Sequence, residues 1–214
     1  MTEPTRTTSL TELSCAQFTE ALCSVAPIPG GGGAAALTAS LAASLTGMAA
    51  GLTRGKKKFL AYEEDYLRII RKADALRVRF LQLAEADAAA FEPLSKAYSL
   101  DRSVPEAFQV FRSAALNAAS PPFSVMQGVN ELTALLEELL PRCSCLMLSD
   151  LGCAASHAAA ALESAALNVF VNTGCLPGDA EAQALEAEAA AMLHEGLPRL
   201  QVIAGTVRSE LCPH

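Results

Sequence analysis

The 214-residue sequence has no tryptophan, only 5% aromatic residues and few clusters of β-branched residues. No segment alternates between apolar and polar residues as a half-buried strand does, which argues against a sheet-based fold. The alanine-rich composition instead favours helices that pack closely. We therefore predict an all-α fold in one domain over residues 1–214, an antiparallel multi-helix bundle of about seven helices that includes one long helix.

A long basic stripe is also missing. The net charge is −7 at pH 7, so nucleic acid, whose phosphates require an extended basic surface, is not expected as a partner. The one basic cluster is the run of three lysines at residues 56–58. Such a cluster in an acidic protein either binds an anionic small molecule or begins a helix in solvent, and the sequence leaves both readings open.

Signals for export and for metal binding are absent as well. The first four residues lack the basic and apolar regions of a signal peptide. Seven cysteines are an odd number without the spacing of a disulfide framework, so we expect reduced thiols and a cytoplasmic location. Cys143 and Cys145 offer only two ligands, and the three histidines have no paired spacing. No metal site is expected.

Charge is almost absent from two long stretches, residues 34–53 and 151–172. Both are long enough to raise the question of a membrane protein, but alanine, serine, threonine and glycine dominate them. The second contains Glu163, and an ionisable group at the bilayer centre costs about 3 kcal/mol on insertion scales. We therefore expect both stretches to form core or subunit-interface helices, with no membrane partner.

Capping motifs and prolines set the expected helix boundaries. Residues 9–12 and 103–106 have the pattern of a capping box, whereas Pro93 is expected to kink or end the long helix and the prolines at 121–122 to break a later one. The expected helices cover residues 9–25, the segment from the glycine run to 52, 56–92, 103–119, the segment after 122 to 140, 149–173, and the segment after 179.

Four consecutive glycines, Gly30, Gly31, Gly32 and Gly33, follow Pro29 where a helix is expected to begin. Glycine costs backbone entropy on folding, so such a run is expected either in a turn with positive φ or where another group approaches the bare backbone. The first N–H groups of the helix are free to bind polar atoms of a ligand. No strand precedes the run, so it does not match a dinucleotide-binding fingerprint.

The long helix carries one acid within a stripe of apolar residues. Spacings of three and four place these side chains on one face: Phe59, Tyr62, Tyr66, Ile69, Ala73, Leu76, Phe80 and Leu83. The next step falls on Asp87, and the stripe resumes at Phe91. An unpaired buried carboxyl has a raised pKa, which suits general acid catalysis near neutral pH. In the alternative interpretation, Asp87 caps a neighbouring helix or pairs with Arg77 or Arg112.

Three further polar residues accompany the second uncharged stretch. Asp150 precedes it, where the N-terminus of a helix favours a negative charge. Asn168 and Asn172 are four residues apart and share one helical face. Because buried amides need partners, these two side chains either form interhelical hydrogen bonds or contact a ligand.

Several motifs resemble, in order, those of the formiminotransferase-cyclodeaminase C-terminal family. They are PGGG at residues 29–32, LTRGKKKF at 52–59, ADAAAF at 86–91, SDL at 149–151 and NVFVN at 168–172. Each motif is weak alone, but the combination is specific, and the resemblance extends over nearly the whole chain, from Leu13 to Ile203.

The resemblance implies an all-helical folate enzyme that forms homodimers or larger assemblies through a helical interface. Family members convert 5-formiminotetrahydrofolate to 5,10-methenyltetrahydrofolate with loss of ammonia, and some stand-alone bacterial members hydrolyse 5,10-methenyltetrahydrofolate instead. Neither reaction needs a cofactor beyond the tetrahydrofolate substrate. The family's catalytic aspartate corresponds to Asp87. The candidate substrate-binding residues are Gly30, Gly31, Gly32, Gly33, Lys57, Lys58, Asp150, Asn168 and Asn172.

Within that set, Lys57 and Lys58 suit the glutamate carboxylates of a folate tail, with or without polyglutamylation. The glycines would let the pterin or its linker approach backbone N–H groups. The sequence departs from the family at Gly33, where relatives usually carry serine. The alternative function is therefore a catalytically inactive folate-binding or assembly protein that keeps the same fold.

Overall fold

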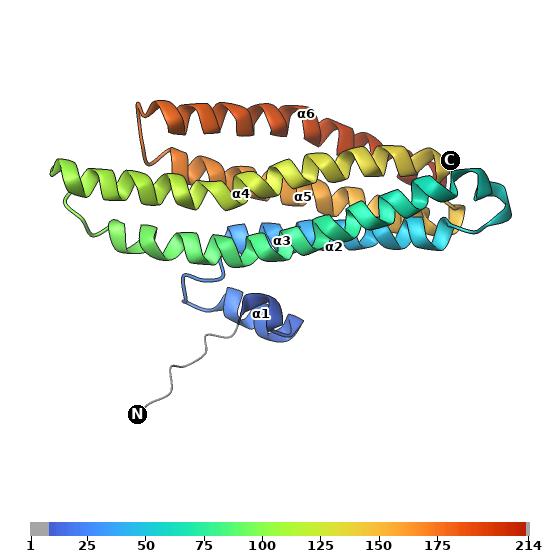
Figure 1. Ribbon diagram of the computed structural model, residues 1–214, viewed down its shortest axis with the longest axis horizontal. Coiled ribbons are helices and arrows are strands. Elements are labelled where there is room, and N and C mark those ends of the chain that lie inside the picture. The colour runs from blue at the N-terminus through green and yellow to red at the C-terminus, as the bar shows by residue number, and fades with distance from the viewer. Residues whose placement is uncertain (1–8, 213–214) are drawn as a thin grey trace.

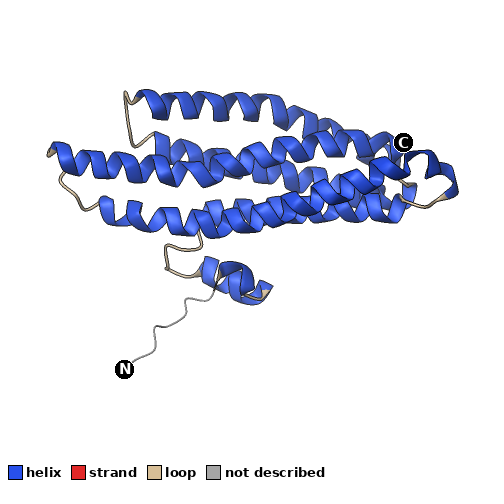
Figure 2. Ribbon diagram, viewed as in Figure 1, coloured by secondary structure: helices blue, strands red, loops and turns tan. Residues whose placement is uncertain are grey.

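A computed structural model describes residues 9–212, and within this range the chain is helical and contains no strand (Figure 2). The predicted all-α fold is confirmed. The α-helices are α1 (Cys15–Cys23), α2 (Gly31–Thr53), α3 (Glu63–Ala97), α4 (Pro105–Leu139), α5 (Leu148–Thr173) and α6 (Ala180–Leu211). Short 3-10 helices cover Leu10–Glu12, Lys57–Tyr62, Leu140–Arg142 and Cys145–Met147.

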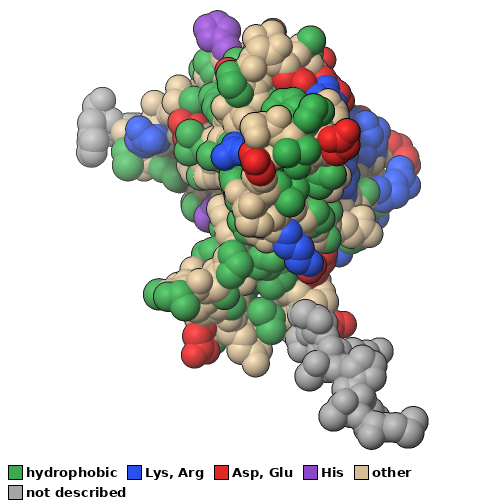
Figure 3. All heavy atoms as spheres, turned by 90° about the vertical axis from the view of Figure 1, so that its left-hand side faces the viewer, with side chains coloured by type: hydrophobic (Ala, Val, Ile, Leu, Met, Phe, Trp, Pro, Cys, Tyr) green, Lys and Arg blue, Asp and Glu red, His purple; other side chains and the backbone are tan. Residues whose placement is uncertain are grey.

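Helices α2 to α5 form an elongated antiparallel bundle (Figure 1). Both α2 and α4 pack against α3 and α5, and α6 covers the bundle mainly along α5. Helix α1 lies apart, below the bundle in Figure 1, and Phe18 is its one buried residue. Figure 3 shows hydrophobic side chains exposed on this lower projection.

The prediction that Pro121 and Pro122 break a helix is wrong. Helix α4 continues through both prolines, so the described residues contain six α-helices, close to the seven expected. Helix α3 also continues through Pro93, which was expected to kink or end it. A proline inside a helix loses one backbone hydrogen bond and strains the preceding turn. Pro121 and Pro122 are both buried, so packing on the neighbouring helices outweighs this local cost.

The two predicted capping boxes are also wrong, since their serines bond elsewhere. The hydroxyl of Ser9 donates to Glu85 on α3, with 2.5 Å between Oγ and Oε1. The hydroxyl of Ser103 donates to Asp101, and α4 begins with Pro105 in its first turn. The capping box that does form lies at Ser14, whose backbone N–H and side chain pair with Gln17.

Small residues allow α2 and α5 to pack closely in the core. Their buried alanines are Ala35, Ala36, Ala39, Ala42, Ala43, Ala49 and Ala50 on α2, and Ala154, Ala155, Ala158, Ala161, Ala165 and Ala166 on α5. Both helices are long and apolar enough to cross a membrane, a test that core helices of soluble proteins also pass. Only 50% and 44% of the two apolar windows are buried within the chain, so each helix also has an outward face. The outward face of α2 includes the exposed Leu41, Met48 and Leu52.

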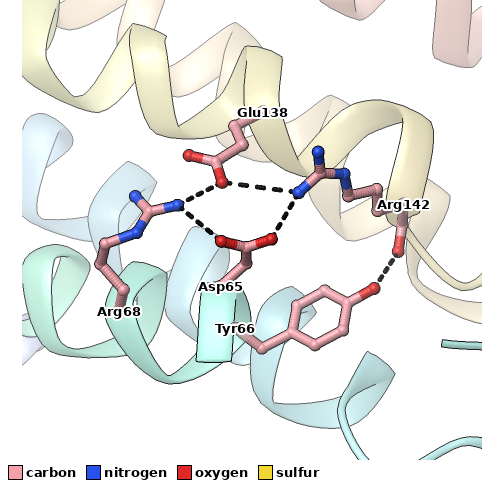
Figure 4. A network of polar contacts seen from close by, with 5 residues as sticks. All are labelled: Asp65, Tyr66, Arg68, Glu138 and Arg142. Carbon is pink, nitrogen blue, oxygen red and sulfur yellow. Dashed lines mark hydrogen bonds and ion pairs between the residues drawn. The ribbon is translucent and has the colours of Figure 1, made fainter. Parts of the chain in front are cut away.

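A network of charged side chains joins α3 to the end of α4, far from the glycine run (Figure 4). Arg68 pairs with Asp65 and with Glu138, and Arg142 pairs with the same two carboxylates. Tyr66 adds a hydrogen bond of 2.7 Å from its hydroxyl to the carbonyl oxygen of Arg142. These contacts fix the register between the two longest helices.

Close packing predicts opposite effects for alanine at two helical glycines. A Cβ at Gly128 would lie 2.6 Å from Cε1 of the fully buried Phe80, whereas a Cβ at Gly47 would make an ordinary 3.7 Å contact with Ala73. We expect Gly128→Ala to lower the free energy of unfolding by about 1 to 3 kcal/mol. The matched Gly47→Ala variant should raise it by up to about 1 kcal/mol. Urea unfolding of both variants tests the packing, and equal shifts would contradict it.

Candidate functional site

The glycine run forms the N-terminus of α2, and none of its glycines has a positive φ. The positive-φ explanation is therefore wrong, and close approach is the reason for the run. A Cβ at Gly32 would lie 2.1 Å from Oδ1 of Asp87, and a Cβ at Gly31 would lie 3.2 Å from Nδ2 of Asn168. Side chains from α3 and α5 thus occupy the space that larger residues on α2 would fill.

Asp87 lies on α3 against this helix terminus and is partly buried. Burial raises the pKa of Asp87 from 3.8 to about 6, and a hydrogen bond from the backbone N–H of Gly33 offsets part of this rise. No ion pair involves Asp87 within residues 9–212. The suggested partners are occupied elsewhere, Arg77 by Asp74 and Arg112 by Asp179, so the ion-pair alternative is wrong.

A cavity of about 120 Å³ opens beside the carboxyl of Asp87. It is lined by Pro27, Ile28, Gly30, Gly31, Gly32, Asp87, Ala88, Phe91, Ala118, Asn168, Val171 and Asn172. Four segments far apart in the sequence therefore meet here: the start of α2, the later part of α3, the middle of α4 and the end of α5.

The two asparagines form hydrogen bonds and also line the cavity. Nδ2 of Asn172 donates to the carbonyl oxygen of Ala118 on α4 at 3.0 Å, which is an interhelical bond. Nδ2 of Asn168 donates within its own helix to Ser164 at 2.8 Å. Within the described chain, neither Oδ1 accepts a hydrogen bond, so each amide keeps an acceptor without a partner.

Lys57, Lys58 and Asp150, which were also predicted to bind the substrate, lie outside this cavity. Helix α2 has 23 residues, so its two ends are about 34 Å apart at 1.5 Å per residue. Both lysines follow its C-terminus, and Asp150 lies in the first turn of α5 at the same end of the bundle. The antiparallel arrangement of α2 and α5 therefore separates these three residues from Asp87 within one chain.

The cavity also contains residues that were not among the predicted site residues. Phe91 follows Asp87 by four residues, so helical spacing alone places both on one face of α3, and this signal could have identified it. Pro27 and Ile28 form a wall from the extended segment before α2. Val171 lies one residue before Asn172 and is 61% exposed at the cavity rim.

The chemistry that this arrangement allows is proton transfer. A carboxyl with a pKa near 6 is populated in both its neutral and ionised forms around neutral pH, so it can donate and accept a proton. The first N–H groups of α2 have no partner within their helix and can bind a negatively polarised atom. No group of three or more His, Cys, Asp and Glu side chains within residues 9–212 is arranged to bind a metal ion.

Comparison with known proteins finds one family over most of the chain. The family described as Formiminotransferase-cyclodeaminase matches residues 14–191. Methenyltetrahydrofolate cyclohydrolase of Methylorubrum extorquens is 33% identical over 198 residues, which cover 91% of this chain and 95% of that protein. Formimidoyltransferase-cyclodeaminase of Mus musculus is 27% identical over 206 residues, which cover 94% of this chain but only 38% of the mouse protein.

A solved structure has the same fold. The crystal structure of formiminotetrahydrofolate cyclodeaminase from Thermotoga maritima superposes with a TM-score of 0.81 at 25% sequence identity. The superposition covers 92% of this chain and 98% of the other.

Burial of Asp87 predicts a pH-dependent effect of Asp87→Asn on stability. Because the folded-state pKa is raised, the protein loses stability as the pH rises from the unfolded pKa of 3.8 to about 6, and the full cost is present above that pH. We expect Asp87→Asn to raise the free energy of unfolding by about 2 kcal/mol at pH 8, and by less at pH 5.

Urea unfolding at the two pH values measures this difference. Glu188→Gln on α6 is a suitable control because Glu188 is exposed and makes no ion pair within residues 9–212. An Asp87→Asn protein that is less stable than the wild type at pH 8 would contradict the effect of burial.

Proposed function

Since the chain belongs to the formiminotransferase-cyclodeaminase family, we propose that it is an enzyme of folate one-carbon metabolism. Its substrate is a one-carbon adduct of tetrahydrofolate. The observation that carries the proposal is the Asp87 carboxyl, whose pKa is near 6 and which lies against the glycine N-terminus of α2.

Two reactions fit this site. Cyclohydrolysis of 5,10-methenyltetrahydrofolate is favoured by the match to the M. extorquens cyclohydrolase over nearly the full length of both proteins. Cyclodeamination of 5-formiminotetrahydrofolate to 5,10-methenyltetrahydrofolate and ammonia is favoured by the similarity to the T. maritima cyclodeaminase. Both pass through a tetrahedral carbon between two folate nitrogens, so one acid–base group serves either reaction.

In cyclohydrolysis, water adds to the methenyl carbon while the Asp87 carboxylate accepts one of its protons. The new hydroxyl then loses its proton to solvent as the carbonyl forms, and one ring carbon–nitrogen bond breaks. Neutral Asp87 returns its proton to the departing nitrogen, so the carboxylate is regenerated.

In cyclodeamination, N10 of the folate attacks the formimino carbon on N5. Neutral Asp87 protonates the amino group of the tetrahedral centre, and the carbon–nitrogen bond to ammonia breaks. The resulting carboxylate accepts the proton that N10 loses. The first N–H groups of α2 bind polar atoms beside the reacting carbon, and Phe91 offers an aromatic face to the pterin.

The proposal extends to the state of the protein. It is a homodimer or a larger homo-oligomer in the cytoplasm, it needs no metal or cofactor beyond the tetrahydrofolate substrate, and neither nucleic acid nor a membrane is a partner. The exposed apolar side chains of Leu41, Met48 and Leu52 on α2 support a contact between subunits.

Catalysis by Asp87 predicts that Asp87→Asn lowers kcat by about 10² to 10⁴ while folate binding is retained, because the amide cannot exchange a proton. The absorbance of methenyltetrahydrofolate measures turnover in both directions, and ammonia release separates deamination from hydrolysis. A wild-type protein that binds folate without turnover would instead support the inactive folate-binding alternative.

The departure at Gly33 predicts a second effect. A Cβ there would make ordinary contacts, 3.7 Å from Cβ of Pro29 and 4.0 Å from Oδ2 of Asp87. Gly33→Ser therefore brings a hydroxyl donor to the carboxylate, and a hydrogen bond of about 1 kcal/mol lowers the pKa of Asp87 by about 0.7.

We expect the limb of the pH–rate profile that reports Asp87 to move toward acid by this amount in Gly33→Ser. The matched Gly33→Ala variant adds the same Cβ without a donor and should leave the limb in place. Equal movement in both variants would show that the hydroxyl has no role.

A further inference from the structure

A groove of about 510 Å³ lies between α3 and α4, away from the cavity at Asp87. It is lined by Arg68, Lys72, Ala75, Leu76 and Arg79 on α3, and by Glu131, Ala134, Leu135 and Glu138 on α4. Its volume falls within the range of about 300 to 1,000 Å³ that is typical of small-molecule sites. The groove and the cavity share no lining residue, so they are separate features of the bundle.

Ion pairs between the two helices close both ends of the groove. Arg68 pairs with Glu138 at one end, where both belong to the network of Figure 4. Arg79 pairs with Glu131 at the other end, with 2.8 Å between Nη1 and Oε1. Both arginines therefore already have a carboxylate partner, and a ligand that took either of them would have to break an existing pair.

The floor of the groove is apolar. Leu76 and Leu135 form its deepest part, and each side chain is only 5% exposed. Ala75 and Ala134 are exposed beside them, and their short side chains leave open the space that longer residues would fill. An apolar ligand body on this floor would remove its own surface from water, which is the main favourable term in such binding.

Lys72 gives the groove an uncompensated positive charge. It is exposed and forms no ion pair within residues 9–212. Three cationic and two acidic side chains line the groove, so the two ion pairs leave one cation over. Its aliphatic stem can lie along the apolar floor while the ammonium stays in solvent. A single ammonium complements a ligand with one negative charge, whereas a phosphate dianion is better matched by several converging donors.

We propose that this groove binds a small amphipathic monocarboxylate, a molecule with an apolar body and one carboxylate. The carboxylate pairs with the ammonium of Lys72, and the apolar body lies on Leu76 and Leu135. From Lys72 to Arg79 the helix rises by about 10 Å, which leaves room for a short hydrocarbon chain. Lys72 is about 22 Å from Asp87 along α3, so this site does not depend on the proposed function.

Octanoate and octanol test the two parts of the site, because they have the same hydrocarbon chain and only octanoate is charged at neutral pH. Isothermal titration calorimetry at physiological ionic strength should show one saturable octanoate site per chain. Octanol should bind about threefold to tenfold more weakly. Lys72→Glu should weaken octanoate binding about tenfold, since repulsion replaces attraction, and should change octanol binding by less than about twofold.

Two further variants separate the groove from the rest of the surface. Arg71→Glu makes a similar charge change on the same helix, at an exposed residue that does not line the groove. It should retain octanoate binding within about twofold of the wild type. Ala134→Phe places a large side chain in the groove and should weaken both ligands about tenfold or more. Urea unfolding confirms that each variant is folded.

A wild-type protein without saturable octanoate binding would overturn the proposal. So would equal losses of octanoate and octanol binding in Lys72→Glu, or an equal loss of octanoate binding in Arg71→Glu. Undiminished binding in Ala134→Phe would place the ligand elsewhere, for example on the exposed apolar side chains of α2. Folate turnover should be unchanged in Lys72→Glu, and its absence from the wild type would remove the proposed function without affecting the octanoate result.

Discussion

The contact between the Asp87 carboxyl and the backbone of Gly32 is the constraint on which the site depends. It requires a residue without Cβ on α2, because any larger residue would place an atom 2.1 Å from Oδ1. It also requires α3 to lie close to α2, which the alanines of the core allow. The same preference for small residues therefore explains both the packing of the bundle and the position of the acid.

Two opposing influences set the proton affinity of Asp87. Burial favours the neutral acid, and the N–H of Gly33 at a helix N-terminus favours the carboxylate. A neighbouring arginine would lower the pKa of Asp87 and leave almost no neutral acid at neutral pH. Arg77 and Arg112 are instead held by Asp74 and by Asp179 with Glu181, so the charge pairs elsewhere in the bundle leave the pKa of Asp87 near 6.

Local sequence patterns predicted what lies within one helix more accurately than what lies between helices. The interruption of an apolar stripe identified Asp87, and the spacing of four placed Asn168 and Asn172 on one face. Both signals depend only on helical geometry. Helix α5 was expected over residues 149–173 and is observed at Leu148–Thr173. The apolar stripe that contains Asp87 is buried at Tyr66, Ile69, Ala73, Leu76 and Phe80.

The wrong predictions concern helix ends and helix caps, which depend on contacts between helices. Local rules place a helix end at Pro121, but they do not include the neighbours that bury both prolines. Ser9 has the pattern of a helix cap, yet its hydroxyl donates a hydrogen bond to Glu85, which is distant in sequence. The family motifs give the order of Lys57, Asp87 and Asp150 along the chain. They do not predict which helix ends lie next to each other.

Helix α2 spans the distance between those helix ends, and its two faces differ in composition. Its inner face of alanines fixes the distance to α3 and α5, and thereby the approach of Asp87 to Gly32. Its outer face has larger apolar side chains and no charge, and it runs from the cavity to the residues just before the lysines. Because α2 is about 34 Å long, the cavity at its start and the lysines after its end are separated within one chain. The absence of charge on its inner face is required for close packing, since an unpaired buried charge would be strongly destabilising.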